Sequence, residues 1–321
     1  MPKKSLDRVN SVDSIIEQDS PALSDISERD APWDEHRATS DKVSDYYQGT
    51  EFQGYSDKIR FCSEVLDFRL IPNSDTGEYK LKLSSARFCR VRTCQVCIWR
   101  RSLRWKARAY ENLPKVVIAY PSARYLFVTL TVRNCAITEL RQTLDWMNKS
   151  FVRMTKLKDF PAIGWIKSVE VTRGRTPSGS AHPHFHVLMM VKPAYFSYNY
   201  LSKDDWIQLW RRSLRVDYNP SIDVKAVKPR QSPVALIPEI LKYQTKPSDL
   251  VADREWFLEM TRQMAGTKAI SLGGVLREFF RDLEKEPEDL IGKDDDGEEL
   301  IDEGHLYFGW RRKEKKYKLN S

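Results

Sequence analysis

Alternating apolar and polar positions dominate the middle of the chain and predict β-strands there. The clearest pattern is residues 181–191, AHPHFHVLMMV. Successive side chains of a strand point to opposite faces, so His184 and His186 share one face, while Phe185 and Val187 share the other. We interpret the Phe185 face as the core face. The protein has only five histidines, and three of them lie in this stretch.

The preceding strand adds a carboxylate to the histidine pair. Residues 163–172 also read as a strand, and the turn-rich segment 173–180 joins the two strands into an antiparallel hairpin. A roughly symmetric hairpin centred near Pro177 places Glu170 opposite His184 and on the same face. Two imidazoles and one carboxylate with open positions are typical of a divalent metal site. The alternative is a solvent-facing glutamate beside two ordinary histidines, and a slip of one residue in register would separate them.

Further strands and helices follow from the same kinds of pattern. Apolar residues that recur every three or four positions predict amphipathic helices, and β-branched or alternating runs predict strands. Together these elements are consistent with an α+β fold. Besides the hairpin, the predicted strands are 64–71, 78–83, 125–133 and 221–228, and the predicted helices are 138–157, one that opens at Ser202, 249–265 and 267–286.

Charge is distributed unevenly along the chain. The formal net charge is +8, but residues 1–51 carry 12 acidic and 6 basic side chains, a net charge of −6, so the remainder carries about +14. A basic folded body favours a polyanionic partner such as nucleic acid. Residues 1–55 are rich in serine and aspartate and lack sustained periodicity, so we expect a disordered acidic tail.

The apolar runs are short. None is long enough to cross a membrane, and the N-terminus lacks the apolar core of a secretory signal. We therefore expect a soluble cytoplasmic protein without a membrane partner. In that reducing compartment, cysteines favour metal binding over disulfides.

Four cysteines are placed to bind a metal ion. Cys94 and Cys97 form a C-x2-C knuckle, Cys89 lies just before it, and the predicted hairpin after Cys62 brings that residue back. Four thiolates would fill the tetrahedral coordination sphere of a structural Zn2+. The alternative is a set of small buried apolar side chains. Cys135 lies apart, after a predicted strand, and is left out of the site.

The segment after the cysteine knuckle predicts a basic helix. Residues 98–108 interleave arginine and lysine with Trp99 and Trp105, a composition suited to phosphate contacts and base stacking. The alternative for the tryptophans is packing in the core. We predict DNA contacts from this helix and from the loop of the histidine hairpin, through Arg100, Arg101, Arg104, Lys106, Arg108, Arg173 and Arg175.

A later helix is predicted to begin near Pro238 and to end before Pro247. Glu239, Tyr243 and Lys246 follow one another at spacings of four and three residues, so they share one face of that helix. An acid, a phenol and an amine aligned in this way could supply a base, a nucleophile and a positive charge for phosphoryl transfer. The alternative is a surface Glu–Lys pair beside a half-buried tyrosine.

The order of these motifs resembles the HUH endonucleases, in particular the single-tyrosine rolling-circle replication initiators of small bacterial plasmids. The resemblance spans roughly residues 62–246 and rests on the His-Pro-His-Phe-His strand followed by Glu-x-x-x-Tyr-x-x-Lys. The run 127–131, FVTLT, is similar to the family's first motif. The cysteine cluster followed by Arg-Arg-Ser is similar to the segment that precedes that motif in the family.

The resemblance implies a role for each candidate residue. His184, His186 and Glu170 would hold one Mg2+ or Mn2+ ion that acts on the scissile phosphate. Tyr243 would attack in line, which forms a 5′-phosphotyrosine and frees a 3′-OH that primes replication. A phenol has a pKa of about 10, so the metal, assisted by Lys246, would lower the cost of forming the phenolate.

In relatives, the glutamate of the tyrosine helix activates water for the terminating cleavage. Glu239 occupies that position, so the resemblance implies release of the protein by hydrolysis. The chain has no Gly-x4-Gly-Lys-Ser/Thr loop, so strand unwinding would need a host helicase. The partners implied are single-stranded and supercoiled origin DNA and the host replication machinery, with a homodimer on the origin as one arrangement.

The resemblance also implies an architecture, an antiparallel sheet of about five strands with helices on one face and the metal site on the other. Four regions follow from it and from the patterns above. They are a disordered acidic tail at 1–55, a zinc-binding subdomain with the basic helix at 56–115, an HUH endonuclease domain at 116–250 and a helical C-terminal extension at 251–321.

Three other functions stay open on the sequence. The protein could be an HUH-type transposase or relaxase. It could be a two-His-carboxylate metallohydrolase for another substrate, in which case Tyr243 would be incidental. It could also be a non-catalytic, zinc-containing DNA-binding protein that uses only the cysteine knuckle and the basic helix. Formation of a covalent DNA adduct separates the HUH enzymes from the other two classes.

Overall fold

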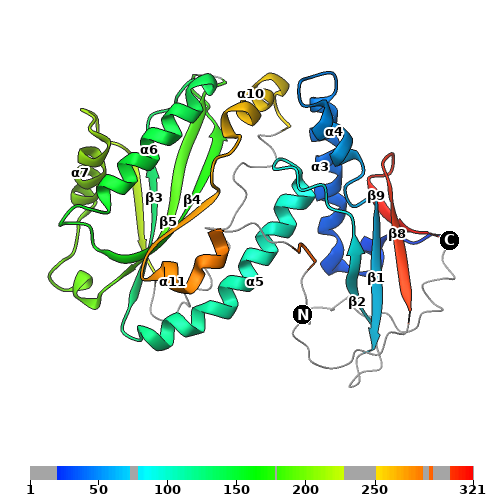
Figure 1. Ribbon diagram of the computed structural model, residues 1–321, viewed down its shortest axis with the longest axis horizontal. Helices are drawn as coiled ribbons and strands as arrows, with labels where there is room; N and C mark the ends of the chain where they lie inside the picture. The colour runs from blue at the N-terminus through cyan, green and yellow to red at the C-terminus, as the bar shows by residue number, and fades with distance from the viewer. Residues whose placement is uncertain are drawn as a thin grey trace, which may run out of the picture. The chain divides into compact units, whose positions relative to one another are not determined.

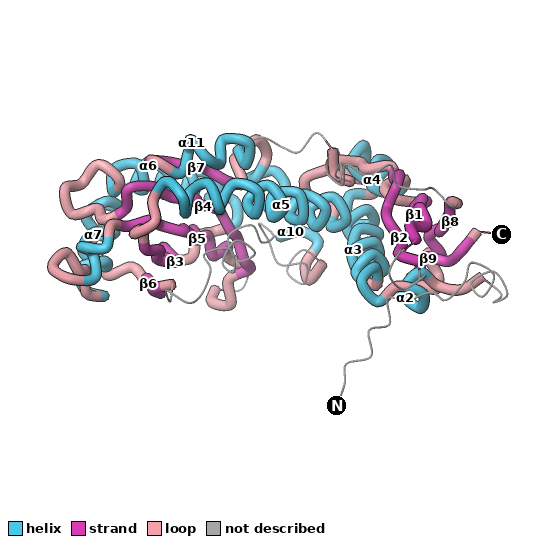
Figure 2. The backbone as a smooth tube through the Cα atoms, turned by 90° about the horizontal axis from the view of Figure 1, so that it is seen from below, coloured by secondary structure: helices cyan, strands magenta, loops and turns pink. Residues whose placement is uncertain are grey.

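The computed structural model describes residues 20–72, 79–177, 179–227, 251–284, 289–291 and 304–320. The chain divides into two compact units (Figure 1). We call residues 1–101 with 288–321 the terminal unit, and residues 102–287 the central unit. The boundary falls inside the 25-residue helix α5 (Gln95–Ala119), which is one uninterrupted coil in Figure 2 although Pro114 lies within it. Among the described residues, no helix has the length and apolar character needed to span a membrane.

The central unit is built on a five-stranded antiparallel sheet, as predicted. Its strand order is β6-β3-β5-β4-β7, so the histidine strand β5 lies in the middle. The long hairpin of β4 and β5 forms the centre of this sheet. The strands are β3 (Arg124–Thr131), β4 (Ala162–Arg173), β5 (Ala181–Val191), β6 (Ile222–Ala226) and β7 (Ile270–Gly274).

Helices cover both faces of this sheet, so the prediction of helices on one face is wrong. On one face, Phe185 packs edge-to-face against Phe151 of α6 (Leu140–Met154), with ring centroids 6.2 Å apart. On the other face, Leu188 and Met190 belong to a core cluster that includes α5 and α11 (Leu276–Phe280). Alternation in β5 gives way to a continuous apolar run after His186, and such a run is typical of a strand buried on both faces.

Two more helices and three short 3-10 segments complete the described part of the central unit. Helix α7 (Lys203–Leu214) packs against α6. Ser202 caps α7, because its hydroxyl accepts a hydrogen bond from the amide of Asp205, while the Asp205 carboxylate accepts one from the amide of Ser202. This reciprocal pair is the expected way for a helix to satisfy its first amides. The others are α10 (Arg254–Met264) and the short 3-10 segments η2 (Ile137–Glu139), η3 (Pro193–Phe196) and η5 (Arg281–Glu284).

The predicted helix over 267–286 is partly wrong, because it contains the edge strand β7. This strand pairs with β4, and it also places part of the sheet beyond the predicted domain boundary at 250. Gly273 permits the close approach, since a Cβ there would lie 1.9 Å from the ring of Trp165. Gly274 has a φ of +56°, which favours glycine and ends the strand.

The terminal unit contains a second antiparallel sheet, in the order β2-β1-β8-β9. Its last two strands come from the end of the chain, so the prediction of a helical C-terminal extension over 251–321 is wrong for these strands, although α10 and α11 lie in the first part of that range. Figure 1 shows β8 beside β1, and the register pairs Leu66 with Phe308. The strands are β1 (Val65–Pro72), β2 (Tyr79–Ala86), β8 (His305–Arg311) and β9 (Lys316–Leu319).

The predicted disorder is wrong for residues 20–55. This region contains α2 (Leu23–Ile26), the 3-10 segment η1 (Glu28–Asp30), α3 (Pro32–Tyr47) and the start of α4 (Gln53–Arg60). Trp33 is buried and packs on Trp99 at 4.8 Å and on Tyr317 at 6.2 Å between ring centroids.

The acidic composition of this region misled the prediction because some of its charges are internal. Arg37 and Asp41 form a buried ion pair at 2.8 Å on α3. The Asp41 carboxylate also accepts hydrogen bonds from Trp310 on β8 and from Arg312 in the turn that follows β8. A segment counted as a solvated acidic tail is therefore partly held by partners more than 250 residues away in the sequence.

Candidate functional site

The β4–β5 hairpin brings the predicted metal ligands together. The register pairs Glu170 with His184 directly, as a symmetric hairpin requires, and pairs Ser168 with His186. The hairpin therefore places Glu170, His184 and His186 on one face of two neighbouring strands. We call these three residues the Glu–His–His cluster.

One carboxylate oxygen lies at the centre of this cluster. Glu170 Oε2 lies 2.8 Å from His186 Nε2 and 3.3 Å from His184 Nε2. Glu170 and His184 are buried, and His186 is half-buried, with its ring stacked on that of Phe127 at 5.5 Å. The three ligand atoms are thus held by two strands and an aromatic ring that covers one side.

The other ring nitrogens have partners that orient the imidazoles. His184 Nδ1 lies 3.2 Å from the carbonyl oxygen of His182, so Nδ1 carries the proton that it donates to this oxygen. With a proton on Nδ1, His184 would present the lone pair of Nε2, the nitrogen that lies nearest Glu170 Oε2, to a bound cation. His186 Nδ1 lies 3.2 Å from the hydroxyl oxygen of Thr129 on β3. Contacts of this kind, which fix ring orientation, are usual for metal-binding histidines.

The Glu170 carboxylate is held in its charged form. Burial acts to raise its pKa, but hydrogen bonds and attraction from His184 and His186 outweigh burial and leave the pKa well below its ordinary value. A carboxylate that stays ionised, with two imidazole nitrogens beside it, is chemically competent to bind a cation.

The donor set and its dimensions fit a divalent ion. One ligand atom from each of the three residues lies within 4.8 Å of the other two. Three protein ligands leave coordination positions for water or substrate, unlike a structural site with four. The residues therefore support a metal site open to a substrate, without specifying which ion it holds.

The first histidine of the motif has a different partner. His182 Nδ1 lies 2.7 Å from the side-chain oxygen of Asn134, and burial lowers the pKa of this imidazole. Asn134 also donates to the carbonyl of Thr176 in the hairpin loop. Sequence reasoning missed both Asn134 and Thr129, although Thr129 lies in the 127–131 motif.

The predicted cysteine site also assembles, within the terminal unit. Cys62 follows α4, Cys89 follows β2, and Cys94 and Cys97 flank the start of α5. Their sulfurs lie 3.6 Å apart for Cys62–Cys97 and Cys94–Cys62, and 3.7 Å for Cys89–Cys97. We call these four residues the cysteine cluster.

The sulfur separations match a tetrahedral zinc site. With Zn–S bonds of about 2.3 Å, the edges of a tetrahedron measure about 3.8 Å. Backbone amides support the sulfurs as well, since Cys89 N donates to Cys62 Sγ at 3.4 Å and Arg90 N donates to Cys97 Sγ at 3.3 Å. Hydrogen bonds with Cys89 and the other cysteines, together with burial, raise the pKa of the Cys62 thiol. A bound cation would oppose that rise by favouring thiolates.

The predicted DNA-contacting residues fall into two groups. Arg101 is buried and donates to the carbonyl of Arg90 at 2.6 Å, and Arg100 donates to the carbonyls of Leu290 and Ile291. Both guanidinium groups are engaged within the terminal unit.

The remaining predicted contacts belong to the central unit. Arg104, Lys106 and Arg108 are half-buried on α5, and Arg108 donates to the carbonyl of Asp282 at 2.8 Å. Arg175 is exposed in the loop of the hairpin. Arg173 forms an ion pair at 2.6 Å with Asp253, the residue that caps α10.

The predicted catalytic residues lie outside the described residues. Glu239, Tyr243 and Lys246 all belong to the undescribed range 228–250. After this range, Asp253 pairs with Arg173 at the end of β4, and Trp256 donates to the carbonyl of Ser180 next to β5. Ten residues separate Tyr243 from Asp253, and ten residues span up to about 35 Å when extended.

The family comparison agrees with the resemblance seen in the motifs. A family model described as "Replication protein" (Rep_1) matches residues 80–318. This range includes the Glu–His–His cluster and the cysteines from Cys89 onward.

Several curated proteins are similar to this chain over most of its length. It is 36% identical to "Protein rep" of Lactiplantibacillus plantarum over 79% of this chain and 83% of that protein. It is 32% identical to "Protein rep" of Lentilactobacillus hilgardii over 85% and 90%, respectively. It is 31% identical to "Protein rep" of a Streptococcus pneumoniae strain over 90% and 92%. No solved structure matches the chain. The chain belongs to the Rep_1 family of plasmid replication proteins.

Proposed function

We propose that this protein initiates rolling-circle replication of a plasmid by nicking and joining one DNA strand at the origin. The observation that carries the proposal is the Glu–His–His cluster, in which one carboxylate oxygen lies 2.8 Å and 3.3 Å from two imidazole nitrogens in a chain of the replication protein family. The curated relatives named "Protein rep" support replication over transposition or conjugative transfer.

The metal ligands would bind Mg2+ or Mn2+ in this proposal. Such an ion would polarise the scissile phosphate and stabilise its developing charge. Glu170 supplies negative charge, and Thr129 and the His182 carbonyl keep the two ligand imidazoles oriented. Stacking on Phe127 excludes water from one side of His186. The chain's own task at this site is to hold the phosphate beside preorganised ligands.

Tyr243 is the proposed nucleophile. Its phenolic oxygen forms a bond to phosphorus, the bond from phosphorus to the 3′-oxygen breaks, and the 3′-oxygen takes a proton to become a 3′-OH. Lys246 would supply positive charge that favours the phenolate, because a phenol ordinarily has a pKa of about 10. Glu239 would later act as a base on the water that hydrolyses the phosphotyrosine and releases the protein.

The cysteine cluster is proposed to hold a structural Zn2+, and the exposed basic residues to contact DNA. The cluster's four ligands leave no position for a substrate, which separates its role from that of the Glu–His–His cluster. Arg175 and the half-buried Arg104 and Lys106 of α5 would supply phosphate contacts, and a host helicase would unwind the strands. The homodimer on the origin stays a prediction.

The decisive experiment is incubation of the protein with supercoiled and single-stranded origin DNA in Mn2+, followed by mapping of any peptide–nucleotide adduct. We expect nicked circles and an adduct at Tyr243. Tyr243→Phe should abolish both, whereas the control Tyr307→Phe, a half-exposed tyrosine of the terminal unit, should retain both. An adduct that persists in Tyr243→Phe contradicts the assignment. Binding without any metal-dependent cleavage favours the non-catalytic alternative.

A further inference from the structure

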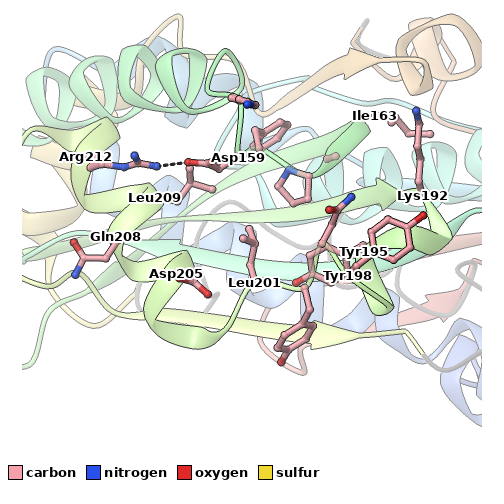
Figure 3. A pocket seen from close by; sticks show the side chains of 16 residues that line it. Asp159, Ile163, Lys192, Tyr195, Tyr198, Leu201, Asp205, Gln208, Leu209 and Arg212 are labelled. Atoms are coloured by element: carbon pink, nitrogen blue, oxygen red, sulfur yellow. Dashed lines mark hydrogen bonds and ion pairs between the residues drawn. The ribbon is translucent and has the colours of Figure 1, made fainter.

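A cavity of about 850 Å3 lies at the end of the central sheet away from the metal ligands. It is formed by the loop that leads into β4, the loop that follows β5 and the helix α7. Figure 3 shows the Arg212–Asp159 pair at one side of the cavity and Lys192 with Tyr195 at the other. Lys192 directly follows β5 and comes six residues after His186, the nearest residue of the cluster along the chain, which corresponds to about 20 Å along a strand. The cavity is therefore separate from the Glu–His–His cluster.

Aromatic side chains are concentrated on one wall of this cavity. The segment 195–200, YFSYNY, contains four aromatic residues in six positions. Tyr198 is 82% exposed and Tyr200 is 64% exposed, and both line the cavity. Large aromatic rings this accessible and this close together commonly mark a binding surface.

The aromatic loop is held at both ends. At its start, Tyr195 is buried, and its hydroxyl oxygen accepts a hydrogen bond of 3.0 Å from Trp206 Nε1 of α7. The backbone amides of Ser197, Tyr198 and Asn199 all donate to one carbonyl, that of Ala194. At its end, the Ser202 cap joins the loop to α7. These contacts hold the backbone that carries Tyr198 and Tyr200 in a defined position.

The charge of the cavity favours an anionic ligand. Lys158, Lys192 and Arg212 line it together with two carboxylates. Asp159 is paired with Arg212 at 2.8 Å, and Asp205 is occupied by the cap of α7. The two lysines are exposed and lie on opposite loops, one before β4 and one after β5. Lysines beside accessible aromatic rings match the requirements for a nucleic-acid strand with unpaired bases, because bases stack on rings and phosphates contact ammonium groups.

We propose that this cavity is a second binding site for single-stranded DNA, in which bases stack on Tyr198 and Tyr200 and phosphates contact Lys158 and Lys192. The proposal rests on the proposed function in taking DNA as the ligand, but it requires neither the metal nor cleavage. A duplex fits it poorly, because paired bases do not expose their faces for stacking. A site about 20 Å from the cluster along the direction of β5 would hold DNA strand that is already unwound while the nick site is engaged at the cluster.

The test measures binding of a fluorescein-labelled 20-mer of thymidine to the full-length protein, by anisotropy, without added Mg2+ or Mn2+. Because each stacked base contributes roughly a factor of ten in affinity, Tyr198→Ala/Tyr200→Ala should raise the Kd about tenfold or more. Lys158→Gln/Lys192→Gln should reduce the slope of log affinity against log salt by about 0.7 for each lost phosphate contact. A duplex of equal length should show no comparable effect of the tyrosine substitutions.

Tyr307→Ala is the matched control, a tyrosine 48% exposed on β8, and it should bind as the wild type does. Photocrosslinking of the wild type to a bromodeoxyuridine-substituted 20-mer should map to residues 195–200. An unchanged Kd in the double tyrosine variant, or crosslinks confined to other segments, overturns the proposal. Nicking of origin DNA by the wild type in Mn2+ is measured separately. If the wild type does not nick but its Kd still depends on Tyr198 and Tyr200, the proposed function is wrong while the second binding site stands.

Discussion

The cysteine cluster and the Glu–His–His cluster are assembled in different ways. The four cysteines come from segments up to 35 residues apart, and three of the four are buried. The three ligands of the other cluster lie on two adjacent strands, and His186 keeps 18% of its side chain exposed. Four converging sulfurs complete a coordination sphere and tie loops together. Three ligands on one face of a hairpin leave one side for a substrate.

Of the changes considered at the two clusters, loss of the cysteine cluster should have the largest effect on the folding of the protein. Cys94→Ser should abolish zinc binding and unfold the terminal unit, because a structural zinc contributes on the order of 10 kcal/mol to the folding of small metal-binding domains. Metal analysis after gel filtration and hydrogen exchange of residues 20–101 measure these effects. Cys135→Ser, a cysteine outside the cluster, is the control and should retain one zinc. A folded Cys94→Ser protein without zinc would contradict the structural role.

Loss of a ligand from the Glu–His–His cluster should abolish cleavage but leave the fold. His186→Ala removes one of three ligands, so we expect metal-dependent nicking to fall to background. The unfolding temperature should change little, since this half-buried ring is not part of the core. Nicking of supercoiled origin DNA and thermal unfolding measure the two outcomes. His305→Asn in the terminal unit serves as the control and should nick normally. Wild-type nicking rates in His186→Ala would remove this cluster from the mechanism.

The opposite face of β4 offers a way to separate metal-site effects from sheet stability. Lys167 Nζ is buried against the ring of Phe185, 3.9 Å from its centroid, and donates to Asn148 Oδ1 at 2.6 Å. Burial lowers the pKa of Lys167 to about 7, from 10.5. The unfolded chain therefore binds more protons between these values, so stability should rise with pH from about 7 to about 10.5.

Lys167→Met should remove this rise and stabilise the protein most below pH 7. The expected gain is several kcal/mol, since each unit of pKa shift corresponds to about 1.4 kcal/mol. Denaturant unfolding of the central unit at pH 6, 8 and 10 measures the effect. Lys225→Met on β6, whose side chain is 71% exposed, is the control and should leave the pH dependence unchanged. An equal pH dependence in wild type and Lys167→Met would mean that the Lys167 ammonium is not destabilised by burial.

The smallest expected effect comes from the group that orients a ligand without binding metal. Thr129→Val removes the hydroxyl that lies 3.2 Å from His186 Nδ1. Loss of such a partner typically costs about 10- to 100-fold in metal affinity, so the Mn2+ concentration for half-maximal nicking should rise by that factor. Thr131→Val is the control, because its hydroxyl donates to the carbonyl of Ser221 instead. An equal Mn2+ requirement in both variants would show that Thr129 does not orient His186.

Sequence reasoning succeeded where the contacts are local. The pairing of Glu170 with His184 follows from alternation and the position of the turn, and the structure has that register. The cysteine cluster follows from the C-x2-C spacing and a hairpin that returns Cys62, and the four sulfurs do converge. In both cases, a single hairpin of neighbouring strands brings the partners together, so few arrangements compete.

The failures involve partners that are distant in the sequence. Trp33 and Asp41 fell within the predicted acidic tail. Trp33 instead packs against Tyr317, and the Asp41 carboxylate accepts a hydrogen bond from Trp310. Strand β7 was assigned to a helix because its five residues are too few for a clear alternation, and pairing with β4 decided its conformation. The prediction of helices on only one face of the central sheet failed for a related reason. The apolar run at the end of β5 indicates burial, but it does not predict which elements pack on each face.

The sequence alone determined the family, the two candidate sets of metal ligands and the strand register that brings one set together, because these depend on residue identity and on spacing over short distances. Tertiary structure decided which arginines contact the protein itself, how the two ends of the chain meet in one sheet, and which ring nitrogens of the histidines face Glu170. Those outcomes depend on the burial and hydrogen bonding of groups far apart in the sequence, and a pattern along the chain does not contain that information.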